Sequence, residues 1–176
     1  MITTFQDRLA REQQHLLASA SFEEAPKGVG TVRFLARCNG DSGAVIERAK
    51  EILMLVNENS TGEWPEDAKW FELLPKWFVD RCAPEDTQEE AEKWLAWWKT
   101  LPPEEQGRVE RQKAWPLDDW VYWFVPDNRT WFWWDAVAVD VNNLVVAVDV
   151  YEWPFPSGSL TWLLRASGAV SVESEQ

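Results

Sequence analysis

The chain of 176 residues is long enough for one domain that buries about 70% of its unfolded surface. With 45% hydrophobic and 27% charged residues, its composition is that of a globular protein and excludes a largely disordered chain. The net charge of −13 argues against direct binding of nucleic acid or of an anionic membrane, because the protein would repel both polyanions.

The N-terminal part has the apolar periodicity of amphipathic helices. Residues 3–20 place apolar side chains near one helical face, with the only histidine, His15, on the polar side. Residues 43–57 give the clearest helix, and Asp41 or Ser42 would cap its start. Its apolar stripe consists of Val45, Ala49, Ile52, Leu53 and Val56.

Residues 31–38, with the sequence TVRFLARC, fit two structures. Apolar and polar side chains alternate as in a strand, but the following Asn39-Gly40 would also end a short helix. Because the segments on both sides are helical, we interpret residues 31–38 as a helix.

Three more helices are expected in the middle of the chain, at residues 65–82, 87–100 and 103–114. Pro75 should break or kink the first near Leu74, and Thr87 opens the second with a capping box. The third is largely polar and is expected on the outside. The side chains expected to face the core are Ala68, Phe71, Leu74, Phe78, Cys82, Ala91, Trp94, Leu95 and Trp98.

The aromatic block 120–153 reads as three extended segments, at about residues 119–125, 131–140 and 144–153. Asn142-Asn143 suits a two-residue hairpin turn, in which Val141 pairs with Leu144. This register puts Asp135 and Asp149 on opposite faces of the sheet. The more aliphatic face should meet the helices, and the other should form a shallow concavity between aromatic and carboxylate side chains.

The C-terminal part is expected to hold one short helix, LTWLLRAS, capped by Ser159 and closed by Gly168. The tail, residues 169–176, is expected to fray. The predicted fold is therefore α+β: four to six N-terminal helices, a three-stranded antiparallel β-meander and a C-terminal helix. We expect a single domain over residues 1–168, with a possible sub-boundary near 58–63, where charge and tryptophan content change.

The motifs of catalysis and metal binding are poorly represented. Gly40-Asp41-Ser42-Gly43 resembles the stretch around a serine-protease nucleophile, but the only histidine, His15, lies on an expected surface helix, so we interpret the motif as a turn followed by a helix cap. One histidine and two distant cysteines give no zinc spacing, and phosphate-binding glycine loops are absent from the sequence. We therefore predict no metal and no cofactor, and we do not expect an enzyme.

The location follows from the same kind of evidence. No apolar run approaches the roughly 20 residues that cross a bilayer, and the start lacks the apolar core of an export signal. Cys38 and Cys82 are too few for a disulfide framework and suggest a reducing compartment. We therefore expect a cytoplasmic protein.

Acidic and aromatic side chains together suggest protein binding. Residues 58–92 carry eleven acids and three bases, and all fourteen tryptophans lie between Trp64 and Trp162. The leading hypothesis is an acidic interaction or inhibitor-type protein that binds a basic protein partner. The alternatives are a small-ligand module with a Trp-lined pocket on the sheet, a hydrolase using strand carboxylates, and a homo-oligomer joined through its tryptophans. The candidate binding residues are Trp123, Phe132, Trp134, Asp140, Asp149 and Tyr151.

Overall fold

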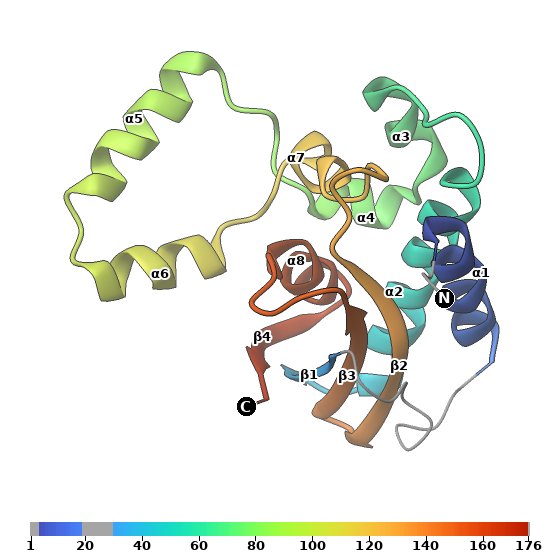
Figure 1. Cartoon of the computed structure of the whole chain (residues 1–176). Helices are drawn as coiled ribbons and strands as arrows, with labels where there is room; N and C mark the ends of the chain where they lie inside the picture. Colours follow the sequence, from blue (N-terminus) through green and yellow to red (C-terminus); the bar gives the residue numbers. More distant parts are fainter. Residues whose placement is uncertain (1–3, 19–29, 176) are drawn as a thin grey trace.

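A four-stranded antiparallel sheet with helices packed around it forms the centre of the protein (Figure 1). The computed structural model describes residues 4–18 and 30–175, and all statements below concern these residues. The strand order is β2-β3-β1-β4. The strands are β1 (Thr31–Cys38), β2 (Trp131–Asp140), β3 (Asn143–Val150) and β4 (Ala169–Ser174). The α+β class is confirmed, but the sheet has one strand more than predicted.

The interpretation of residues 31–38 as a helix is wrong. These residues form β1, which pairs with β3 on one side and with β4 on the other. Phe34, Ala36 and Cys38 alternate into the core, as the period of two in the sequence indicates. Helical neighbours do not decide the structure of a segment, because strand pairing comes from residues far away in the chain.

The C-terminal tail is also not frayed, because residues 169–174 form β4. Ala169 is buried, and β4 follows α8 (Gly158–Ala166) directly. Gly168 makes this tight connection with a φ of +128°, a conformation that few other residues adopt. The predicted cap of α8 is wrong as well. Ser157 stands at that position, and Ser159 is buried, where its hydroxyl accepts a hydrogen bond from the indole of Trp131.

The first predicted strand, residues 119–125, is instead helix α7 (Leu117–Tyr122) and the turn after it. Four buried side chains follow a helical spacing: Leu117, Trp120, Val121 and Phe124. Aspartates in the first turn of α7 favour the helix, because they lie near its positive end. The high aromatic content concealed this period.

The N-terminal helices follow the prediction closely. They are α1 (Phe5–Leu17) and α2 (Ser42–Asn59), and Asp41 caps α2. The whole predicted stripe of α2 is buried. The chain then breaks at Leu74-Pro75 into α3 (Asp67–Leu73) and α4 (Lys76–Arg81), as Pro75 predicted. The inward side chain of α3 is Trp70, and the predicted Phe71 is 53% exposed.

Helices α5 (Gln88–Lys99) and α6 (Pro103–Gln112) form an arm that projects away from the sheet (Figure 1). Thr87 caps α5 as predicted, and α6 lies outside as predicted. The expectation that Ala91, Trp94, Leu95 and Trp98 face the core is wrong, since neither helix, as far as the structure describes them, has a buried residue. The apolar stripe of α5 correctly indicates that these side chains share one face of the helix. It does not indicate which part of the protein packs against that face.

The core lies between the sheet and the helices α2 and α8, with α3, α4 and α7 closing one end. Its residues come from both sides of residue 60. In the described ranges, no helix has the length and apolar character required to span a membrane.

Candidate functional site

Four of the six predicted binding residues lie together on the outer face of the sheet. Phe132 pairs with Asp149 across β2 and β3, and the rings of Phe132 and Tyr151 are 5.9 Å apart. The indole of Trp134 is near them, because Arg11 contacts both Trp134 and Asp149. This surface is not an open concavity: helix α1 packs on β2, and Phe132, Trp134 and Asp149 are buried.

The register of the hairpin explains why these residues meet. The predicted pairing of Val141 with Leu144 is wrong, because Asp140 pairs with Asn143 and Ala138 with Leu144. A β-bulge at Trp134 shifts the register again. Asp135 therefore pairs with Ala147, which places it on the same face as Asp149. The prediction of opposite faces for these two aspartates is wrong.

Asp149 is held by two arginines of α1. Arg11 Nη2 is 2.8 Å and Arg8 Nη1 is 3.5 Å from its Oδ2, and the guanidinium of Arg8 also lies 3.5 Å above the ring of Tyr151. Burial raises the pKa of Asp149, and the positive charges of Arg11 and Arg8 offset part of that rise. Burial likewise raises the pKa of Tyr151. The carboxylate thus fastens α1 to the sheet.

His15 belongs to the same cluster, although the periodicity placed it on the polar side of its helix. Its ring centre is 4.0 Å from that of Trp134 at an interplanar angle of 38°. The polar side of α1 is therefore the side that meets the sheet's outer face. The sequence held a signal for this contact between α1 and the sheet. Arg8, Arg11 and His15 recur at helical spacing, and a buried Asp149 needs a positively charged partner.

The other two predicted residues lie elsewhere. Asp140 sits in the β2–β3 turn, where it accepts hydrogen bonds from the backbone of Asn142 (2.8 Å) and the side chain of Asn143 (2.9 Å). These bonds, with that of Asn142 first, lower the pKa of Asp140. Trp123 follows α7 and packs partly buried against the main core. Asp140 and Trp123 therefore lie outside the cluster around Asp149.

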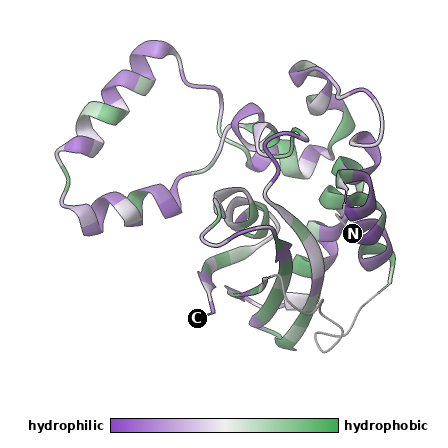
Figure 2. Cartoon of the chain, in the orientation of Figure 1, coloured by the Kyte–Doolittle hydropathy of each residue, from purple (hydrophilic) through white to green (hydrophobic). Residues whose placement is uncertain are grey.

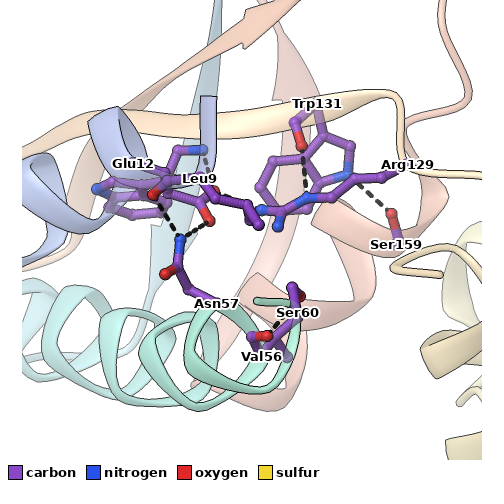
Figure 3. A network of polar contacts seen from close by, with 9 residues as sticks. Leu9, Glu12, Val56, Asn57, Ser60, Arg129, Trp131 and Ser159 are labelled. Atoms are coloured by element: carbon purple, nitrogen blue, oxygen red, sulfur yellow. Dashed lines mark hydrogen bonds and ion pairs between the residues drawn. The ribbon is translucent and has the colours of Figure 1, made fainter. Parts of the chain in front are cut away.

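A second polar cluster is buried on the other side of α1 (Figure 3). Glu12 forms an ion pair with Arg129 and accepts hydrogen bonds from Asn57 Nδ2 (2.9 Å) and from the backbone of Trp133 (2.8 Å). Arg129 also donates to the carbonyl of Trp131. The side chains of Glu12 and Arg129 are fully enclosed, so this network joins α1, α2 and β2 inside the fold.

The candidate nucleophiles are committed to structural roles. Asp41 caps α2, and the buried Ser42 donates its hydroxyl to the carbonyl of Asp140, which confirms the turn-and-cap explanation of that motif. Burial raises the pKa of Cys82 to about 11 and also raises that of Cys38, so both thiols stay protonated at neutral pH. Among residues 4–18 and 30–175, no group of three or more histidine, cysteine or carboxylate side chains is placed to hold a metal ion.

The arm carries two large hydrophobic side chains that are exposed. Trp97 is 49% and Leu95 43% exposed, while Trp94 and Trp98 lie partly buried towards α6. Figure 2 shows hydrophobic segments of α5 on this arm, away from the sheet. Where the arm joins the body, Ala83 donates a backbone hydrogen bond to the carbonyl of Trp115 (2.9 Å). The arm thus presents apolar surface that its own fold leaves uncovered.

Five carboxylates gather where the arm meets the body, and we call them the acidic neck: Asp67, Glu85, Asp86, Asp118 and Asp119. The charge and hydrogen bond of Asp118 raise the pKa of Glu85, and Asp119 and Asp67 add to the shift. Burial, followed by the charge of Asp118, raises the pKa of Asp119. Lys113 compensates in part, with its Nζ 3.8 Å from Asp86. The neck is a concentrated negative surface beside the arm.

Comparisons with protein-family models, with curated proteins and with solved structures give no significant match.

Proposed function

We propose that this protein is a non-catalytic interaction protein that binds a basic protein partner through the arm and the acidic neck. The observation that carries the proposal is the position of Trp97, 49% exposed on a helix next to clustered carboxylates. Tryptophan is enriched among the residues that dominate binding energy at protein interfaces. The carboxylates would speed association with a positively charged partner and exclude acidic ones.

The outer face of the sheet is a less suitable binding surface than the arm. A small-ligand module there would need α1 to leave Asp149, because Arg8 and Arg11 occupy the space that a ligand would take. A hydrolase would use the carboxylate of Asp149, which is already engaged in the ion pairs with Arg8 and Arg11. The arm needs no such rearrangement.

The test compares the protein with a neck variant in which Glu85, Asp118 and Asp119 are changed to their amides. Each form is immobilised and exposed to lysate of the source cells at low and high salt, and retained proteins are identified by mass spectrometry. We expect the wild-type protein to retain a basic protein at low salt, and the neck variant to lose it. Equal retention by both forms, or a partner without positive charge, would contradict the proposal.

A further inference from the structure

We propose that the segment of the partner seated on the arm is an amphipathic α-helix, which lies along α5 with its basic end at the acidic neck. This inference rests on the proposed function and specifies the partner. It starts from the arm itself, in which α6 covers only one side of α5. The contacts include the indole Nε1 of Trp98 donating to the carbonyl of Gln106 (3.3 Å), Gln106 Nε2 donating to the carbonyl of Trp98 (3.1 Å), and Lys113 Nζ, just after α6, lying 4.0 Å from the ring of Trp94.

Trp97 lies beside this covered side, because it follows Trp94 by three positions and precedes Trp98 by one. Glu90 precedes Trp97 by seven positions, which is about two helical turns, so both side chains project from the same flank about 10 Å apart along the axis. An apolar side chain towards the tip is thus aligned with a carboxylate towards the body. A helix along this flank of α5 would complete a three-helix bundle with α5 and α6.

The surface of the arm favours a helical occupant over a strand. Both elements of the arm are helices, whose backbone groups are hydrogen-bonded internally, so along their length they offer side chains to a partner. A partner segment must therefore satisfy its own backbone, as a helix does when it lies in an apolar groove. The 12 residues of α5 span about 18 Å, enough to support roughly three turns of a partner helix.

The charge distribution along the arm sets the polarity of that partner. The carboxylates of the neck stand at the body end, where Asp118 and Asp119 lie in the first turn of α7 and Asp86 lies 3.8 Å from Lys113 Nζ. Towards the tip, Glu105 is paired with Arg108 at 2.6 Å. A helix with lysine or arginine at its body end and leucine-like side chains facing Trp97 complements both parts.

The probe is a synthetic peptide of 18 residues with leucines at helical spacing and four lysines at one end. A second peptide has the same composition with two prolines in its centre, so it keeps the charge and cannot form the helix. Binding to the full chain is measured by isothermal titration calorimetry at low and at physiological salt. The protein variants are Trp97→Ala and Trp97→Glu, with Trp153→Ala as the matched control, because Trp153 is 56% exposed on a loop outside the arm. Circular dichroism verifies that each variant is folded.

We expect the helical peptide to bind, Trp97→Ala to weaken binding at least tenfold, and Trp153→Ala to leave it within twofold. If the proline peptide binds equally well, the helical occupant is refuted while the capture of basic partners stands. If the helical peptide binds but neither variant at Trp97 weakens it, the docking surface along α5 is refuted. Silence of both peptides at low salt would overturn this inference, whereas the proposed function stands or falls with the retention of a basic protein in the lysate experiment.

Discussion

Replacement of Glu12 by leucine should be among the most destabilising single changes in the chain. The carboxylate of Glu12 is fully enclosed and accepts hydrogen bonds from Arg129, Asn57 and the backbone of Trp133. Leucine would leave the guanidinium of Arg129 buried without its counter-charge. Removal of one partner from such a pair costs about 3–5 kcal/mol, a large part of the 5–15 kcal/mol that typically stabilises a domain.

Urea unfolding followed by tryptophan fluorescence measures this change, and we expect the midpoint to fall by about 2 M. The double variant Glu12→Leu/Arg129→Met separates the ion pair from the packing, because it removes both charges. It should lose less stability than the sum of the single variants by about 2 kcal/mol or more. Glu89→Gln is the matched control, since Glu89 forms an exposed ion pair with Lys93 at 2.9 Å and should matter little. A loss below about 1 kcal/mol for Glu12→Leu, or strict additivity in the double variant, would refute the reasoning.

Three further predictions concern the neck, the base of the arm and the last strand. The folded-state pKa of Glu85 is raised above its ordinary 4.5, so its contribution to stability is greatest below pH 4.5 and is lost as the pH rises through the raised value. Glu85→Gln should therefore raise the melting temperature at neutral pH but not below pH 4.5, and an unchanged value at neutral pH would count against the acidic neck. A Cβ on Gly158 would lie 2.7 Å from the ring of Trp115, so Gly158→Ala should cost about 1–3 kcal/mol in urea unfolding, whereas Gly62→Ala, with nothing within 4 Å, should be nearly neutral. A chain ending at Gly168 lacks β4 and exposes one edge of β1, so its unfolding midpoint should drop sharply; a midpoint equal to that of the full chain would contradict the pairing.

The parts of the fold that follow local rules could be predicted from the sequence. The stripe of α2, the break at Pro75 and the cap at Thr87 each depend on residues within a few positions of one another. The sheet could not be predicted in this way. The partners of β1 are about 110 and 140 positions away in the chain, and no local pattern of residues 31–38 identifies them.

The arm shows a different limit of prediction from sequence. Its apolar residues repeat with a helical period, and that period correctly gives α5 and its cap. The helical period indicates which side chains lie on one face of α5. It does not indicate whether another element of the protein packs against that face. Trp94 and Trp98 meet α6, whereas Trp97 meets solvent. The sequence predicted which side chains of α5 share a face, and the structure adds that α6 meets Trp98 and leaves Trp97 49% exposed.

One inserted position in β2 decides which side chains lie on the outer face of the sheet. The bulge at Trp134 turns Asp135 to the face of Asp149, which a regular strand would not do. A buried pair of carboxylates on one face demands positive charge, and α1 supplies Arg8 and Arg11 to Asp149. The helix that neutralises this face also covers Phe132 and Trp134, the aromatic side chains that would otherwise attract a ligand. The requirement for charge compensation within the fold thus closes the outer sheet face where α1 lies, whereas Trp97 on the arm stays 49% exposed. The proposed partner would therefore reach Trp97 without any displacement of α1.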